Sequence, residues 1–341
     1  MDMGNGRVSI REVSQLSGVS ISTVSRIINQ TGRFSKETEK KVFQVMKDLN
    51  YVPNRLAQSM RSHNNLTVGI LIPDILDEPH ALIVRIIQRD LLEAGYITTI
   101  FNTGEDPSVV RRCIEMMHSQ QMMGMVCIPS RQMTGEEVDQ LPTVYFGRRP
   151  PKARVDNSLL ISVDNDQVGY MAGKKLLAHG CRRICVMMDE LDLLPHVQRL
   201  NGLKRALAEQ QLTITPDMIL RGHSSRTTQM LDMLQQWAVH TDAPDGIFAM
   251  EVRPALGAMK VIQELRWPTY LIGFGKLRLM DYGLLNMDSI DEPVKEMAHE
   301  AASALLAMVE KGPDAVTDKV FQPYETRMEA CNLHPGSAES L

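Results

Sequence analysis

Residues 8–29 read VSIREVSQLSGVSISTVSRIIN, and this stretch decides the fold of the N-terminal part of the chain. Apolar residues at positions 10, 13 and 16 predict the buried side of one short helix, which Gly18 ends. Ser20 can cap a second helix, whose inner side is predicted to hold Val24, Ile27 and Ile28. Two short helices joined by a tight turn that contains Gly are typical of a helix-turn-helix.

The second predicted helix carries short polar side chains and an arginine on its outer side. Ile21, Ser22 and Arg26 fall at its N-terminal end or on its outer face, where such helices meet base edges in the major groove. An ordinary helical hairpin is the alternative, because short helix pairs are frequent. The exposed Ser, Thr and Arg face favours the DNA-reading helix.

Charge is divided unevenly along the 341 residues. Residues 1–62 hold ten of the 37 Lys and Arg residues but only five of the 41 Asp and Glu residues, so this segment carries +5 and the remainder −9. A basic segment on an acidic chain is typical of a polyanion binder, because phosphate contacts need local positive charge. Solvated surface charge gives the same imbalance equally often, so composition alone leaves both interpretations open.

Length and cysteine content limit the class of protein. A chain of 341 residues exceeds the roughly 250–300 at which one core usually splits, so two or three domains are expected. No apolar run reaches the roughly 18 residues of a membrane helix and no signal-peptide pattern is visible, so we expect a cytoplasmic protein. The five cysteines are odd in number and lack CxxC spacing, which predicts core thiols rather than disulfides or a metal site.

A third helix and a linker follow the helix-turn-helix. Ser35 is expected to cap this helix, whose apolar stripe repeats at positions 42, 45, 46 and 49. Pro53 ends the N-terminal domain, because the residue before a proline is pushed out of helical geometry. Residues 54–61 are too few for a stable isolated helix, so we expect a linker that becomes ordered conditionally.

From residue 66 onward, short apolar runs alternate with helical stretches. Strands are predicted at 66–73, 96–102, 123–129, 143–147, 183–188, near 219, 246–250, 269–274 and 319–324. Helices are predicted at 80–94, 107–120, 166–179, 196–210, 226–239, 253–264 and 293–310. This alternation predicts two doubly wound α/β units with parallel sheets covered on both faces. A cleft between their strand ends would be the usual place for a small ligand.

The N-terminal domain carries three motifs in order, which are Gly18-Val-Ser-x-x-Thr23-Val-Ser-Arg26-x-x-Asn29, Ser35-x-x-Thr38 and Leu49-Asn-Tyr51-x-Pro53-Asn54. Further segments are Val68-Gly-Ile-Leu-Ile-Pro-Asp74, Val163-Asp164-Asn165, Arg199-x-x-Gly202 and Ile272-Gly-Phe274. In these residues the chain resembles the lactose/galactose repressor family of bacterial transcription regulators over nearly its whole length.

The resemblance implies a homodimer whose two helix-turn-helix heads bind a pseudo-palindromic DNA operator. It also implies a body of two subdomains like those of periplasmic binding proteins. The domain limits would be 1–52 for the head, 53–65 for the hinge helix and linker, 66–162 plus 294–320 for the N-terminal subdomain, 163–293 plus 321–330 for the C-terminal subdomain, and 331–341 for a tail. The tail has no apolar heptads, so we expect no tetramer built by a C-terminal coiled coil.

By position, the resemblance implies DNA contacts from ten residues, which are Ile21, Ser22, Thr23, Ser25, Arg26, Asn29, Tyr51, Asn54, Arg55 and Met60. Arg26 would read a guanine or bind phosphate, and Ile21 and Ser22 would set the preferred operator. Met60 stands where the family usually has a leucine that wedges between base steps in the minor groove. A surface methionine in a linker is the alternative, and the face that Leu56 and Met60 would share favours the wedge.

The residues of the expected ligand cleft depart from the family's pattern. Arg199 matches an arginine that binds sugar hydroxyls, with a plain helix-start arginine as the alternative. Glu251-Val252 replaces Asn-Asp, Gly273-Phe-Gly-Lys276 replaces Gly-Tyr-Asp-Asp, and Glu292 replaces a glutamine. A sugar, a sugar phosphate or a related metabolite is the expected small-molecule effector, whose charge stays open because Lys276 favours an anion and the glutamates do not. The expected effector contacts are Asp77, His80, Arg199, Glu251, Lys276 and Glu292.

Signals for catalysis are weak. Gly273-Phe-Gly-Lys-Leu-Arg278 begins like a dinucleotide fingerprint, but its sixth position is Arg rather than Gly or Ala. His179, His196 and His223 show no metal-ligand spacing and are expected at the surface or in helix caps. We therefore predict a transcription regulator that is not an enzyme and has no cofactor and no metal. A solute-binding protein or an enzyme with a similar doubly wound body is the alternative.

Overall fold

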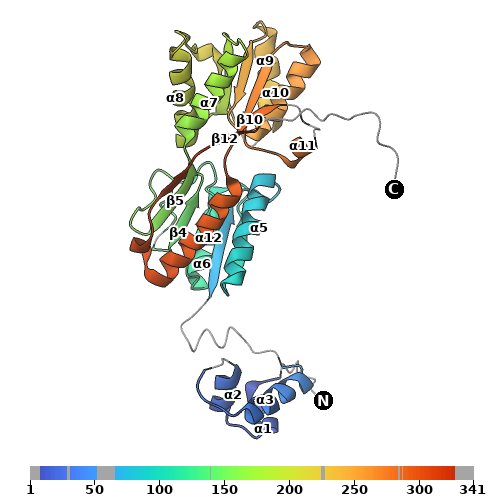
Figure 1. Ribbon diagram of the computed structural model, residues 1–341, viewed down its shortest axis with the longest axis vertical. Coiled ribbons are helices and arrows are strands. Elements are labelled where there is room, and N and C mark those ends of the chain that lie inside the picture. The colour runs from blue at the N-terminus through green and yellow to red at the C-terminus, as the bar shows by residue number, and fades with distance from the viewer. Residues whose placement is uncertain are drawn as a thin grey trace, which may run out of the picture. The chain divides into compact units, whose positions relative to one another are not determined.

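The computed structural model describes residues 8–28, 31–51, 66–138, 140–223, 227–282, 285 and 287–326 (Figure 1). The chain separates into two compact units, the head (Met1–Asn65) and the body (Leu66–Leu341). Within these described ranges, no helix is long and apolar enough to cross a membrane.

The head contains the three predicted helices, α1 (Ile10–Ser17), α2 (Ile21–Ile28) and α3 (Lys36–Asp48). Gly18 ends α1 with a φ of +65°, a left-handed conformation that glycine adopts without strain. The Ser20 hydroxyl accepts a hydrogen bond from the Thr23 N–H at 3.2 Å, and the Ser35 hydroxyl accepts one from the Thr38 N–H at 3.1 Å. The serines therefore cap α2 and α3 as the sequence predicts.

The core of the head differs from the prediction at one position. Val13, Val24, Ile27 and Val42 are fully buried, one or two from each helix. Leu16, which the sequence placed on the buried side of α1, is 62% exposed. The buried positions of α1 are 13 and 17, with the half-buried Ile10 packed beside them. A helix advances about 100° per residue, so position 17 returns closer to the direction of Val13 than position 16 does.

The body has two lobes, each built on a six-stranded sheet (Figure 1). The N-terminal lobe contains β1 (Thr67–Ile72), β2 (Ile97–Asn102), β3 (Met125–Cys127), β4 (Thr143–Phe146), β5 (Ser158–Val163) and β11 (Lys319–Phe321), with helices α5 (Glu78–Glu93), α6 (Pro107–Ser119) and α12 (Val294–Lys311). The C-terminal lobe contains β6 (Ile184–Asp189), β7 (Ile219–Gly222), β8 (Gly246–Ala249), β9 (Tyr270–Phe274), β10 (Asp288–Asp291) and β12 (Tyr324–Thr326), with helices α7 (Asn165–Ala178), α8 (Leu194–Ala208), α9 (Thr227–Val239), α10 (Val252–Leu265) and α11 (Arg278–Asp281).

Strand pairing confirms the predicted α/β fold class. The strand order is β11-β5-β4-β3-β1-β2 in the N-terminal lobe and β12-β10-β9-β8-β6-β7 in the C-terminal lobe. Neighbouring strands pair in parallel, except that β12 runs antiparallel to β10. Along β1, Val68, Ile70 and Ile72 pack with α5 and α12, whereas Leu71 packs with α6 on the other face. This two-sided burial explains the continuous apolar run of β1.

The chain passes between the lobes three times, after β5, after β10 and after β11. The Asp164 N–H donates to the Phe321 carbonyl at 2.8 Å and so joins the first and third crossings. The single strand predicted at 319–324 is wrong, because β11 and β12 belong to different sheets. Pro323 separates them, and proline cannot donate a hydrogen bond to a sheet ladder. The strands β5 and β10 and the helix α11 lie outside the predicted elements.

Candidate functional site

The candidate DNA-reading face lies on α2. Ile21, Ser22 and Arg26 are exposed, and Thr23 and Ser25 are half-buried. The Ser20 hydroxyl lies 2.9 Å from both the Ser22 hydroxyl and the Thr23 hydroxyl, so these groups are held at the N-terminal end of the helix. This placement agrees with a helix whose first turn and outer side face a partner.

The remaining expected DNA contacts are only partly described. Tyr51 is half-buried against the core of the head, and burial raises the pKa of its phenol. Asn29, Asn54, Arg55 and Met60 lie outside the described residues, so their predicted roles stay predictions.

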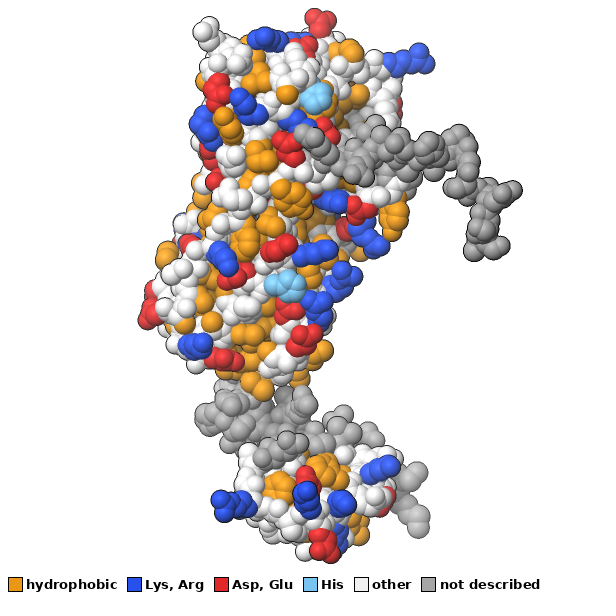
Figure 2. All heavy atoms as spheres, viewed as in Figure 1, with side chains coloured by type: hydrophobic (Ala, Val, Ile, Leu, Met, Phe, Trp, Pro, Cys, Tyr) orange, Lys and Arg blue, Asp and Glu red, His pale blue; other side chains and the backbone are white. Residues whose placement is uncertain are grey.

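In the described part of the head, basic side chains are exposed and carry no carboxylate partner. Among residues 8–28 and 31–51, none of the seven exposed Lys and Arg side chains forms an ion pair; they are Arg11, Arg26, Arg33, Lys36, Lys40, Lys41 and Lys47. Figure 2 shows several basic side chains on the visible surface of the head. Unpaired positive charge of this kind suits contacts with phosphates.

In the body, charged residues gather where parallel strands end. Asp74 follows β1, Asp189 is the last residue of β6, Glu251 follows β8 and Glu292 follows β10. The carboxyl ends of parallel strands meet at one edge of a sheet, and in this body the two edges face each other across the region between the lobes. This region is called the cleft.

Arg199 of α8 is the best-fixed charged group of the cleft. Its Nε donates to the Asn165 side-chain oxygen at 2.9 Å, and its Nη1 donates to the Met250 carbonyl. The guanidinium lies 3.5 Å from the centre of the Phe274 ring, a cation–π arrangement. Burial lowers the pKa of Arg199 to about 10, and the nearby charges of Glu292 and Glu251 oppose that shift.

Two glutamates lie near Arg199. Burial raises the pKa of Glu292 to about 6, although the positive charge of Arg199 acts to lower it. Glu251 lies 2.9 Å from Nε2 of His196, whose Nδ1 accepts a hydrogen bond from the Asp189 N–H at 3.0 Å. Because Nδ1 accepts a hydrogen bond, Nε2 carries the ring proton and donates a hydrogen bond to Glu251.

The prediction for His196 is wrong. Its side chain is 3% exposed and joins two strand ends of the cleft, rather than lying at the surface or in a cap. His179 does cap a helix, since its Nδ1 bonds the Lys175 carbonyl at 2.9 Å. The two histidines show equal signals in the sequence, and only the end of β6 beside α8 distinguishes them.

The other expected effector contacts are engaged within the protein. Asp77 forms an ion pair with Arg253 at 3.3 Å, and Nδ1 of His80 bonds the Asp74 carbonyl at 3.0 Å. Lys276 is exposed and pairs with Asp281. The structure therefore groups Arg199, Glu251 and Glu292, and places Asp77 and His80 on the N-terminal lobe.

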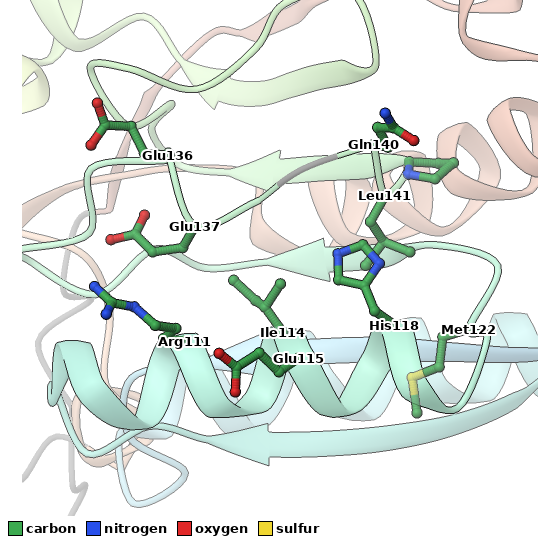
Figure 3. A pocket seen from close by; sticks show the side chains of 10 residues that line it. Arg111, Ile114, Glu115, His118, Met122, Glu136, Glu137, Gln140 and Leu141 are labelled. Carbon is green, nitrogen blue, oxygen red and sulfur yellow. The ribbon is translucent and has the colours of Figure 1, made fainter.

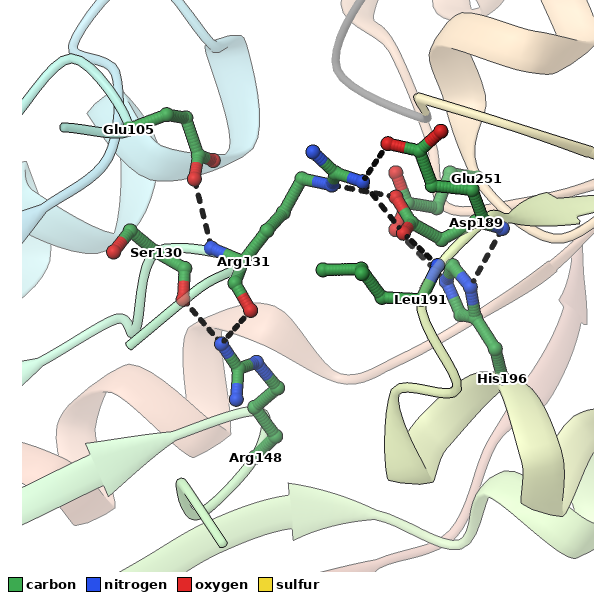
Figure 4. Close-up of polar contacts among 9 residues, drawn as sticks. Glu105, Ser130, Arg131, Arg148, Asp189, Leu191, His196 and Glu251 are labelled. Carbon is green, nitrogen blue, oxygen red and sulfur yellow. Dashed lines mark hydrogen bonds and ion pairs between the residues drawn. The ribbon is translucent and has the colours of Figure 1, made fainter. Parts of the chain in front are cut away.

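Arg131 was not predicted, yet it makes several polar contacts in the cleft (Figure 4). Its guanidinium binds Asp189 through two hydrogen bonds of 2.6 and 2.7 Å and Glu190 at 3.1 Å. Burial alone would lower the pKa of Arg131, but the bonds to Asp189 and Glu190 raise it above its ordinary value. Residues 58 positions apart give no pairing signal in one sequence.

A surface groove lies elsewhere on the N-terminal lobe, between α6 and the residues 136, 137 and 140–142 (Figure 3). Arg111, Glu115, His118 and Glu137 line it together with apolar residues. None of the expected effector contacts lines this groove, and its mixed charges select no ligand class. The strand-end cleft therefore remains the candidate ligand site.

Comparison with known proteins agrees with a DNA-binding head on a ligand-binding body. Residues 9–54 match the model described as bacterial regulatory proteins, lacI family, and residues 174–328 match the periplasmic binding protein-like domain. The chain therefore carries a DNA-binding domain similar to that of the lacI family, followed by a periplasmic binding protein-like domain.

Curated relatives cover most of the chain. The HTH-type transcriptional repressor PurR of Vibrio atlanticus (strain LGP32) is 27% identical over 311 residues, which is 88% of this chain and 92% of that protein. The sucrose operon repressor of Streptococcus mutans serotype c is 27% identical over 308 residues, again 88% of this chain and 92% of that protein. Both relatives match the head and the body together.

A solved structure shows the same fold. The lac repressor dimer bound to operator and the anti-inducer ONPF superimposes with a TM-score of 0.82 at 18% identity, covering 94% of this chain and 98% of that chain. At this identity the match establishes the fold alone. The transcriptional regulator CelR in complex with cellobiose has a TM-score of 0.68 at 24% identity, covering 95% and 99%.

Proposed function

We propose that this protein is a sequence-specific DNA-binding transcription repressor whose operator affinity is controlled by a small molecule in the cleft of the body. The observation that carries the proposal is the exposed face of α2, with Ile21, Ser22 and Arg26 on a head whose described basic side chains lack carboxylate partners. The family and the named repressors among its relatives support the same function. A regulator of this kind acts on the chromosome, so we infer a cytoplasmic location.

Each head would read one half of a pseudo-palindromic operator, as a homodimer presents two equal heads. Arg26 can form two hydrogen bonds with a guanine, Ile21 can contact a thymine methyl group, and Ser22 can bond either type of base pair. Asn29, Tyr51, Asn54 and Arg55 would position the head on the backbone, and Met60 would wedge between base steps.

Arg199 would be the main effector contact. Its bonds to Asn165 and Met250 use part of its five N–H donors, and the stacked Phe274 ring fixes the plane in which the others point. Glu292 and Glu251 supply acceptors beside it. These groups suit a hydroxyl-rich metabolite such as a sugar or a sugar phosphate. Asp77, His80 and Lys276 could join only after leaving their present partners.

Control would follow from the preference of the effector for one arrangement of the two lobes. A ligand shifts such an equilibrium only by its difference in affinity for the two arrangements. The three crossings between the lobes allow the lobes to move relative to one another while each sheet stays intact. In a dimer, that movement would change how residues 54–61 order on the operator.

Titration of the full chain against duplexes from the region upstream of its own gene, at rising salt, tests the proposal. A specific duplex should bind roughly 1,000-fold or more tightly than a scrambled duplex at physiological salt. Equal affinity for both duplexes would sink the proposal and favour a solute-binding protein. A thermal-shift screen with metabolites would then find the effector, because a ligand at about 100 times its Kd adds roughly 2.7 kcal/mol to stability.

A further inference from the structure

Two arginines, one from each lobe, bind carboxylates of the opposite lobe. Arg131 follows β3 of the N-terminal lobe and binds Asp189 and Glu190 at the end of β6. Arg253 belongs to α10 of the C-terminal lobe and binds Asp74 at 3.1 Å and Asp77 at 3.3 Å. Each lobe therefore contributes one arginine to the other lobe's carboxylates and binds the other lobe's arginine through its own carboxylates. The first pair joins the segment after β3 to the end of β6, and the second joins the start of α10 to the segment after β1.

The Arg131 pair is buried and geometrically complete. The Arg131 side chain is 8% exposed and that of Asp189 is 0% exposed. The main chain of Arg131 is fixed as well, because its N–H donates to Glu105 at 2.7 Å and its carbonyl accepts from Arg148 at 3.2 Å (Figure 4). A bidentate pair on a fixed main chain holds one distance between the lobes rather than a range of distances.

The Arg253 pair is more exposed and lies beside a third link. The Arg278 N–H at the start of α11 donates to the Glu78 side chain at 3.1 Å, and Glu78 begins α5 next to Asp77. This hydrogen bond joins a C-terminal-lobe amide to an N-terminal-lobe carboxylate. It therefore reports directly whether the lobes are together at this position.

We propose that Arg131 and Arg253 form a reciprocal latch that holds the two lobes together, and that an effector acts by separating Arg131 from Asp189. The proposal rests on the proposed function for the role of the effector, but the latch itself is a property of the body. In the arrangement described above, the Arg131 guanidinium lies between the strand ends, against Asp189 and Glu190.

The physical basis is the cost of an unpaired buried charge. Removing Arg131 takes a bidentate cation away from the fully buried carboxylate of Asp189, which is unfavourable until the lobes part and water reaches it. The same reasoning applies to an effector that enters the cleft. A neutral ligand that came between Arg131 and Asp189 would remove their two hydrogen bonds without supplying a charge in their place. An effector must therefore open the latch or bring a charged group that replaces one partner.

Hydrogen–deuterium exchange of the full chain tests the latch without DNA or effector. The double variant R131M/R253M removes both cations, and exchange of the Arg278 amide should become at least ~10-fold faster because this amide loses its partner on the other lobe. R149M is the matched control. Arg149 also binds an aspartate through two hydrogen bonds, at 2.9 and 2.7 Å, but that partner, Asp318, lies in the same lobe. R149M should leave the Arg278 amide within about two-fold of wild type.

Peptides from β4 and β8 show whether each lobe remains folded. If R131M/R253M unfolds a lobe, the double variant R131K/R253K tests the latch instead. Lysine keeps the charge but loses the bidentate geometry, so exchange of the Arg278 amide should become faster, but by less than in R131M/R253M. If the Arg278 amide exchanges in both double variants at the same rate as in the wild type, the latch proposal is wrong. A failure of sequence-specific DNA binding would overturn the proposed function and leave this result unaffected, so the two failures are distinguishable.

Discussion

The α2 face of the head and the cleft of the body differ in whether their charged side chains have partners within the chain. In the described part of the head, basic side chains are exposed and lack carboxylate partners. In the cleft, Arg131, Arg199 and Arg253 already have partners within the chain. The head thus offers charge to a partner that the chain does not contain, whereas the cleft satisfies its own charges. DNA can therefore bind without rearrangement of α2, but a ligand of the cleft must compete with existing contacts.

The largest expected effect tests whether the head is a separate unit. Val24→Asp places a carboxylate at a fully buried position of a core with only a few side chains, which costs several kcal/mol and should unfold the head. Specific DNA binding should disappear while calorimetry still shows the unfolding transition of the body.

Phe43→Asp is the control for this variant, because Phe43 is 42% exposed on α3 and should tolerate the change. Loss of the body transition in Val24→Asp would contradict the division of the chain into two units.

The second effect concerns an exposed charge. Arg26→Ala should weaken binding to the preferred operator by about 1–3 kcal/mol, since a bidentate contact with a guanine is worth that much, and it should relax selectivity at one base pair. Fluorescence anisotropy with the operator and with single-base variants measures both changes. The melting temperature should stay the same because the side chain is exposed. Gln44→Ala, also exposed but on α3, should leave affinity unchanged, and an equal loss in both variants would count against the assignment.

The third effect concerns a buried charge, where pH matters. The folded state binds a proton at Glu292 more tightly than the unfolded chain does, since burial raises its pKa from 4.5 to about 6. The contribution of Glu292 to the stability should therefore fall as pH rises from about 4.5 to about 6, and remain lower above that range. Glu292→Gln should abolish this dependence and stabilise the protein by about 1–2 kcal/mol at pH 7.5.

Denaturant unfolding at pH 4.5 and pH 7.5 measures this difference, with Glu115→Gln as the exposed control. A Gln variant that is less stable than the wild type at pH 7.5 would show that the attraction between Glu292 and Arg199 outweighs the cost of burial.

The smallest effect is the loss of a helix cap. Ser35→Ala removes the acceptor for the Thr38 N–H and should destabilise the head by about 1 kcal/mol. Thermal unfolding followed by the head transition measures it, and Ser35→Asp, which keeps an acceptor, should recover most of the loss. Equal stability of all three proteins would mean that water replaces the cap fully.

Local signals in the sequence were sufficient for the head and for the class of the body. The caps at Ser20 and Ser35 and the turn at Gly18 depend on neighbours in sequence, so their patterns predict the observed helices. The prediction that Leu16 is buried is wrong, because a helix of two turns has too few positions to define the direction of its apolar face. Strand ends could be predicted to form a cleft, and Arg199 and Glu292 were placed there by resemblance.

The contacts inside the cleft could not be predicted, for a physical reason. Arg131 meets Asp189 only because β3 and β6 end opposite each other in different lobes, and no spacing in the sequence encodes that meeting. His196 is buried because the end of β6 presents its N–H to that ring. Asp77 was expected to face the effector but meets Arg253 first. Contacts between lobes depend on how the lobes close, which composition and periodicity do not report.

Selection of the full chain against a pool of random duplexes tests the central claim most directly. The account predicts enrichment of one pseudo-palindromic sequence whose two half-sites match, bound roughly 1,000-fold or more tightly than the starting pool at physiological salt. The Arg26→Ala variant should enrich a sequence relaxed at one position of each half-site. A pool that stays random through repeated rounds, with affinity that depends on salt alone, would contradict the account.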